Sequence, residues 1–78
     1  MTPGRFPFKH RVRLYACIEG ARFGLSALEV LGDCRRRPNV IARRGVWQRL
    51  KADGFAIAEI GRMTNRDHTS VLHGLKRL

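Results

Sequence analysis

The chain has 78 residues, which is enough for one small domain with a modest core. Its 16 lysine and arginine residues against 6 aspartate and glutamate residues give a formal net charge of +10 at pH 7. This charge argues against a neutral small-molecule ligand and favours a polyanion as the partner, although a merely soluble basic protein would have the same composition.

The cysteines, histidines and apolar runs argue against several other classes of protein. Cys17 and Cys34 do not resemble a disulfide framework, and no C-x2-C or H-x3-H pair indicates a zinc site. No stretch approaches about 18 consecutive apolar residues, so we expect no membrane span. No serine, cysteine or carboxylate pair has a partner at a catalytic spacing. We therefore expect no enzyme, no metal and no cofactor, and a cytoplasmic, nucleoid-associated location.

The hydrophobic period predicts an all-α chain. Residues 1–9 contain two prolines and a glycine without a period, which predicts a loose arm before a domain over residues 10–78. A first helix is predicted over about residues 10–23. Gly24 then offers the left-handed residue that commonly ends a helix.

Two helices are predicted in the middle of the chain. Ser26 and Glu29 form a capping box that begins a short helix, and Gly32 ends it. A basic loop is expected over residues 33–38 (DCRRRP), and Asn39 is the expected N-cap of a third helix.

The third predicted helix runs to about Ala52 and is closed by Asp53 and Gly54. Its inner face is expected to carry Val46, Trp47 and Leu50. Trp47 is therefore interpreted as core rather than as a platform on which bases stack, and Tyr15 of the first helix is interpreted in the same way.

The most informative segment is the run RDHTSVLH, residues 66–73. A fourth helix is predicted over roughly Ile57–Met63, followed by a turn near Thr64 and Asn65. A fifth helix begins with the polar residues of the run and continues to the C-terminus. Its apolar stripe is Val71, Leu72, Leu75 and Leu78. A polar start followed by a core stripe is typical of the recognition helix of a helix-turn-helix, whose start meets base edges while the stripe anchors it.

Residues 59–61 (EIG) and 66–74 (RDHTSVLHG) together resemble the C-terminal DNA-binding domain, domain IV, of bacterial DnaA-type replication initiators. The family pattern is close to E-I-G followed by R-D-H-T-T-V-L-H-A, and the resemblance covers roughly residues 12–78. It implies a small all-α domain, Trp-repressor-like and DnaA domain IV-like, with a C-terminal helix-turn-helix. The chain has no Gly-rich phosphate loop, so we expect a divergent stand-alone relative.

Besides Ser70 and Gly74, two positions and one turn depart from the family pattern. Ala56 stands where a serine or threonine usually caps the fourth helix, a loss of about 0.5–2 kcal/mol of helix stability. Gly45 stands where a helix-forming glutamine is common, and glycine inside a helix costs about 1 kcal/mol relative to alanine. The turn between Gly61 and Arg66 is one residue shorter than in many initiators.

The resemblance implies that base edges in the major groove are met by Asp67, His68, Thr69 and Ser70. An aspartate accepts from the amino group of cytosine, and a threonine methyl group suits the methyl group of thymine. Asp67 is also explained by the helix dipole, which favours an acid in a first turn. A helical wheel puts His68 near the apolar stripe, so this side chain is either packed or in contact with DNA, and the resemblance favours contact.

The resemblance also places an arginine of the basic loop in the neighbouring minor groove. The matching candidates are Arg35 and Arg36, with Arg37 a weaker match. A narrow minor groove concentrates negative potential and attracts guanidinium groups, although a solvated run of charge is the alternative. Arg44 matches a family arginine that contacts DNA. Phosphates are expected to be held by Arg66, Lys76 and Arg77.

The residues and the resemblance together predict sequence-specific binding of double-stranded DNA by a monomer. The sites would be related to replication-initiator boxes at a bacterial or phage origin, and binding would modulate replication initiation or transcription. The main alternative is a protein-interaction mimic that binds the initiator or its regulators instead of DNA. A third possibility is nonspecific coating of the nucleoid by charge.

Overall fold

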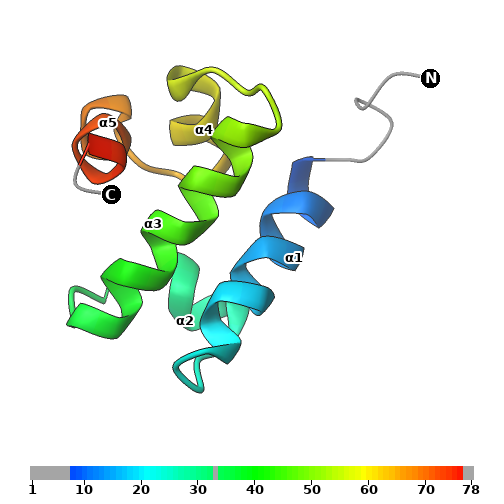
Figure 1. The fold of residues 1–78 in the computed structure, drawn as a ribbon, viewed down its shortest axis with the longest axis vertical. Coiled ribbons are helices and arrows are strands. Elements are labelled where there is room, and N and C mark those ends of the chain that lie inside the picture. Colours follow the sequence, from blue (N-terminus) through cyan, green and yellow to red (C-terminus); the bar gives the residue numbers. More distant parts are fainter. Residues whose placement is uncertain (1–7, 33, 77–78) are drawn as a thin grey trace.

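The computed structural model describes residues 8–32 and 34–76. These residues form five α-helices and no strand, so the all-α prediction is confirmed for this part of the chain (Figure 1). The helices are α1 (Phe8–Ala21), α2 (Ala27–Leu31), α3 (Arg37–Ala52), α4 (Ile57–Met63) and α5 (His68–Lys76). Most of the predicted arm lies outside the described residues, as do Asp33, Arg77 and Leu78.

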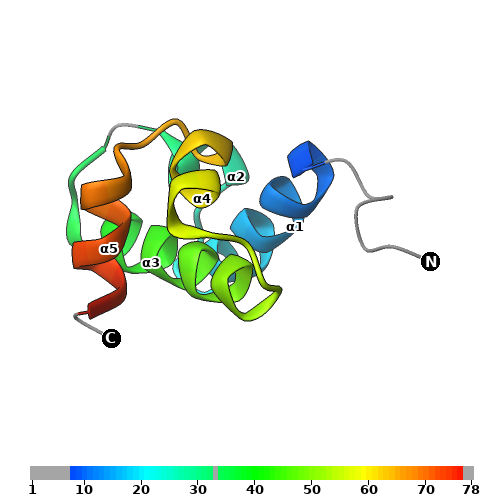
Figure 2. The same ribbon diagram turned by 90° about the horizontal axis from the view of Figure 1, so that it is seen from above.

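Helix α3 is the central element, because it contacts each of the other four helices. Both views place α1 on one side of α3 and α5 on the other (Figures 1 and 2). The buried apolar core draws on all five helices, namely Val12, Ala16, Val30, Ala42, Val46, Trp47, Leu50, Ile60 and Val71. The predicted inner face of the third helix is therefore confirmed. No helix in the described part of the chain is long and apolar enough to span a bilayer.

The ends of the first two helices follow local signals. Helix α1 begins at Phe8, two residues before the predicted start, and ends at Ala21, two residues before the predicted end. Gly24 has a φ of 70°, as predicted for the residue that closes this helix. The capping box is confirmed, since Glu29 N donates to Ser26 Oγ at 3.2 Å and Ser26 N donates to Glu29 Oε1 at 2.8 Å.

The predicted start of the third helix is wrong. Helix α3 begins at Arg37 rather than after Asn39, and Arg36 occupies the N-cap position without a side-chain cap. Pro38 explains the earlier start, because its fixed φ and missing N–H suit the first turn of a helix. Asn39 is buried inside the helix, where its Nδ2 donates to Glu29 O at 3.0 Å. Arg37 therefore belongs to α3 and not to the basic loop.

Helix α4 has its predicted bounds, and a tight turn joins it to α5. Ala56 makes no side-chain cap, but Ala56 N still donates to Glu59 Oε1 at 2.9 Å, so half of a reciprocal cap is present. Asn65 takes up the left-handed conformation, with a φ of 57°. A Cβ on Gly61 would lie 2.7 Å from Arg66 O, so glycine is what allows the turn to pack this closely.

The fifth helix begins at His68, two residues later than predicted. The carbonyl of Asp67 accepts from Ser70 N at 3.0 Å and from Val71 N at 3.2 Å. Arg66 and Asp67 thus belong to the turn that leads into α5, and only the later part of the polar run lies on the helix.

Candidate nucleic-acid interface

The first turn of α5 points its polar side chains into solvent while the following turn is held by the core. The exposed residues there are His68, Thr69 and Ser70, together with Asp67 directly before the helix. Val71, the next residue, is fully buried, and Gly74 is buried against the Trp47 ring of α3. The structure therefore anchors α5 through its middle and leaves its N-terminal end accessible.

His68 is not packed against the core. Its side chain is 67% exposed, and its Nδ1 lies 3.3 Å from Asp67 Oδ1. The wheel places it near the apolar stripe, but His68 is the first residue of α5 and the buried positions begin at Val71. Of the two alternatives that the sequence left, the packed histidine is wrong.

One of the two arginines before α3 lies close to the start of α5. Arg35 and Arg36 are both exposed. Arg35 contributes to two open depressions on the surface. One is lined by Arg35, Arg43, Trp47, Arg66 and Ser70, and the other by Arg35, Arg37, Val40, Ile41 and Arg44. Arg35 and Arg36 are called the basic segment below. The first depression brings Arg35 next to Ser70 in the first turn of α5, although the two are 35 residues apart in the sequence.

Arg43, which the sequence does not single out, is a buried structural residue. Its Nε donates to Val30 O at 3.0 Å, and one terminal nitrogen donates to Gly32 O at 2.6 Å and to Cys34 O at 3.0 Å. These carbonyls lie at and just after the C-terminal end of α2, where a helix leaves carbonyls without partners in its own turns. A guanidinium with five donors satisfies several of them at once.

Arg66, expected to hold a phosphate, is half-buried and directs its guanidinium at the protein. One terminal nitrogen donates to Gly32 O, and the other donates to Asn65 O at 3.4 Å. The partner at Gly32 is 34 residues away in the sequence, so no local pattern predicts the contact.

The two remaining candidate cations occupy different environments. Lys76 is exposed in the last turn of α5. Arg44 is half-buried on α3, and its Cγ lies 3.4 Å from the position that a Cβ on Gly74 would occupy. Both therefore lie on the α3 and α5 side of the molecule. Arg77 is outside the described residues.

The two aromatic residues interpreted as core have different surroundings. Trp47 is buried, and its Nε1 donates to Thr64 Oγ1 at 3.2 Å, which confirms the core interpretation. Tyr15 packs against the core only in part.

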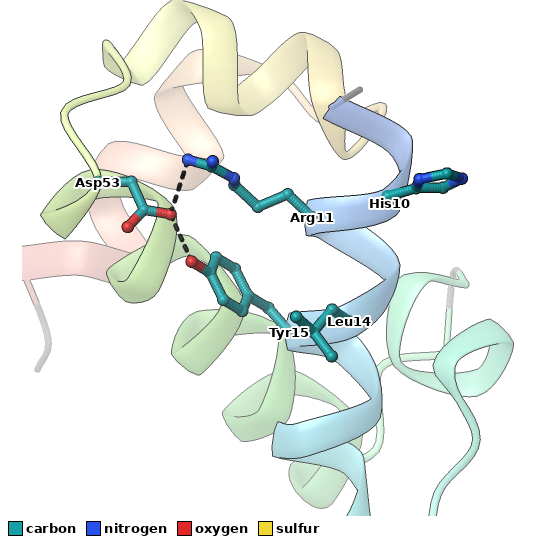
Figure 3. A pocket seen from close by; sticks show the side chains of 5 residues that line it. All are labelled: His10, Arg11, Leu14, Tyr15 and Asp53. Carbon is teal, nitrogen blue, oxygen red and sulfur yellow. Dashed lines mark hydrogen bonds and ion pairs between the residues drawn. The ribbon is translucent and has the colours of Figure 1, made fainter. Parts of the chain in front are cut away.

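Tyr15 lines a mainly apolar pocket between α1 and the end of α3, lined by His10, Arg11, Leu14, Tyr15 and Asp53. Figure 3 shows Arg11 and Tyr15 both directed at Asp53, with distances to Oδ2 of 3.3 Å and 2.5 Å. The hydrogen bond to Asp53, helped by burial, raises the pKa of Tyr15. This group ties α1 to α3 on the side away from α5.

Comparison with known proteins shows similarity to a replication initiator. The chromosomal replication initiator protein DnaA of Thermomicrobium roseum is 40% identical over a 58-residue alignment, which covers 72% of this chain and 12% of the initiator. The chain is related to DnaA. No family model matches the sequence, and no solved structure matches it. The predicted relation to DnaA-type initiators is confirmed in this coarse form, while the assignment to domain IV stays a prediction.

The residues carried over from the DnaA pattern fall into three groups in this structure. Ser70 at the start of α5 and Arg35 of the exposed basic segment line one depression. Lys76 and Arg44 lie farther along α5 and α3. Arg66 differs from both groups, because its guanidinium donates to Gly32 O at the end of α2. It also lines the depression.

Proposed function

We propose that the chain binds double-stranded DNA sequence-specifically, at sites related to DnaA boxes, and thereby modulates replication initiation or transcription. In this proposal α4 and α5 form a helix-turn-helix of the domain IV type, and α5 enters the major groove. The observation that carries it is the exposed polar first turn of α5 directly before the fully buried Val71. A helix held in this way can insert its N-terminal end among base edges without losing its own packing.

The chemistry of that turn suits base edges better than phosphates. Asp67 is exposed, and a carboxylate near the phosphate backbone is repelled unless it accepts a hydrogen bond, for instance from a cytosine amino group. Thr69 and Ser70 supply hydroxyl groups that bond to either donors or acceptors. The exposed His68 lies beside Asp67, in a position to reach the same groove.

The basic segment supplies the second contact. The exposed Arg35 and Arg36 would enter the adjacent minor groove, where the electrostatic potential is most negative over A·T-rich sequence. Lys76 and Arg44 would hold phosphates and so position the domain. If about six phosphate contacts form, the slope of log Kobs against log salt should be near −5. One recognition helix implies a monomer on an asymmetric site.

Fluorescence anisotropy tests this proposal with a duplex carrying an initiator box and a scrambled duplex of equal length, at about 150 mM salt. We expect a preference for the box of about 100-fold, equal to about 2.7 kcal/mol, and loss of this preference in Thr69→Ala. Arg35→Ala should weaken binding more than Arg13→Ala, which removes the same charge from the exposed face of α1. Equal, weak binding to both duplexes would refute sequence-specific recognition.

The second candidate, a protein-interaction role, has one observation in its favour. Large apolar side chains are exposed on α1 and α2 and in the turn between them, namely Leu14, Ile18, Phe23 and Leu28. Asp67→Ala separates the functions. A specific DNA binder should lose discrimination, a nonspecific one should bind slightly more tightly because a negative charge is removed, and binding to a protein partner through α1 and α2 should not change.

A further inference from the structure

One backbone carbonyl connects the two parts of the proposed DNA interface. Gly32 O, at the end of α2, accepts from the guanidinium of Arg43 at 2.6 Å and from that of Arg66. The first arginine comes from α3 and the second from the turn that precedes α5. Both hydrogen bonds have a charged donor, which makes them stronger than bonds between neutral groups.

Each of the two arginines makes further hydrogen bonds, which hold it in place on its own side of Gly32 O. Arg43 also donates to Val30 O and Cys34 O, so it fixes the backbone on both sides of Gly32. Cys34 is the residue directly before Arg35. The backbone N–H of Arg66 donates to Gly61 O at 2.7 Å, which holds this residue on α4 while its side chain reaches Gly32. The depression lined by Arg35 and Ser70 is also lined by Arg43 and Arg66, which both donate to Gly32 O.

We infer that Arg66 is a positioning residue that sets the distance between the basic segment and the first turn of α5. The inference rests on the proposed function and deepens it. Through this link the protein would recognise the separation between a major-groove site and a minor-groove site, as well as the bases themselves. A shift of one base pair moves one site by about 3.4 Å along the axis, more than the few tenths of an ångström that a hydrogen bond tolerates.

The other role for Arg66 is a phosphate contact, and the two roles predict different measurements. A phosphate contact adds affinity on every sequence and contributes about 0.9 to the slope of log Kobs against log salt. A positioning link leaves the salt slope unchanged and acts on spacing. Arg13 gives a matched control, because it is an exposed arginine on α1 outside the proposed interface.

The experiment uses the whole chain and a duplex that the wild type enriches from a random-sequence pool. Hydroxyl-radical footprints of the wild type and of Arg35→Ala locate the segments contacted by α5 and by the basic segment. One A·T pair is then inserted between the two segments. Binding of both duplexes is measured by anisotropy over a range of salt concentrations for the wild type, Arg66→Gln and Arg13→Gln.

We expect the wild type and Arg13→Gln to lose about tenfold, equal to about 1.4 kcal/mol, on the inserted duplex. Arg66→Gln should bind the two duplexes almost equally and keep the salt slope of Arg13→Gln. Arg66→Lys, which retains a charged donor, should recover part of the spacing preference. It also serves as the test if thermal unfolding shows that Arg66→Gln is not folded.

Two results would overturn the inference while leaving the proposed function intact. In one, Arg66→Gln keeps the full spacing preference. In the other, it loses affinity for both duplexes by the same factor with a salt slope smaller by about 0.9, the mark of a phosphate contact. A wild type that enriches no sequence would refute the proposed function and the inference together, before any variant is compared.

Discussion

Gly45, in the interior of α3, gives the sharpest test of how α1 and α3 pack. A Cβ at this position would lie 2.5 Å from Cδ and 2.9 Å from Cγ of Glu19, a residue of α1 whose side chain is only 8% exposed. The Glu19 carboxylate accepts from Arg49 Nε at 2.6 Å and lies 3.4 Å from an Arg22 guanidinium nitrogen. Gly45 therefore leaves room for a buried carboxylate.

The substitution Gly45→Ala combines two opposing effects. Alanine in place of glycine inside a helix should stabilise the chain by about 1 kcal/mol. The new methyl group would push Glu19 away from Arg49, and a hydrogen bond between charged groups contributes about 1.5–3 kcal/mol. We therefore expect a net destabilisation of about 0.5–2 kcal/mol, which for a domain of this size lowers Tm by about 4–8 °C per kcal/mol.

The decisive measurement is the same substitution in a Glu19→Ala background, followed by thermal and urea unfolding of all four variants. Without the Glu19 side chain the clash is removed, so Gly45→Ala should now stabilise the chain by about 1 kcal/mol. The change of sign isolates the contact between the two residues. A Gly45→Ala variant that is stabilised equally in both backgrounds would refute the packing argument.

Three further substitutions test separate contacts. Ala56→Ser should stabilise the chain by about 0.5–2 kcal/mol in urea unfolding, because the serine hydroxyl would complete a cap of which Ala56 N and Glu59 already form one half. An unchanged free energy of unfolding would contradict this expectation. Thr64→Val should cost about 1–3 kcal/mol, because the buried Trp47 indole N–H would lose its acceptor, and an unchanged Tm would contradict this. The hydrogen bond to Asp53 raises the pKa of Tyr15, so the folded chain holds the phenolic proton more tightly than the unfolded chain. Stability should therefore fall as the pH rises above about 10 and through the folded-state pKa, and Tyr15→Phe should remove this part of the fall. Tyr15 is the single tyrosine, so the ultraviolet absorbance of tyrosinate follows it directly, and titration at the ordinary pKa would refute the contact.

The positive charge of the chain has two uses in this structure. The composition alone assigns the excess of arginine to a polyanionic partner. Arg43 is buried and holds the end of α2, Arg11 of α1 pairs with Asp53 directly after α3, and Arg49 of α3 pairs with Glu19 of α1. A part of the cationic excess therefore stabilises the fold, and the exposed arginines of the basic segment carry the electrostatic argument for DNA.

The sequence by itself determined the features that depend on near neighbours. The capping box of Ser26 and Glu29 spans one helical turn, and the bounds of α4 follow from its own period and the turns beside it. The core role of Trp47 follows from the inner face of a single helix. Each of these signals lies within a few residues of the structure that it specifies, because caps, turns and helical period are set by local backbone geometry.

The tertiary structure decided the features whose partners lie far apart in the chain. Asn39 is a buried donor to α2 and not an N-cap, because its partner is the carbonyl of Glu29. His68 is exposed because the core contacts of α5 begin only at Val71. The side chain of Arg66 reaches Gly32 across 34 residues, a contact that exists only once α2, α3 and α5 have packed together. Side-chain partners of this kind are fixed by the assembled helices, so local sequence patterns do not predict them.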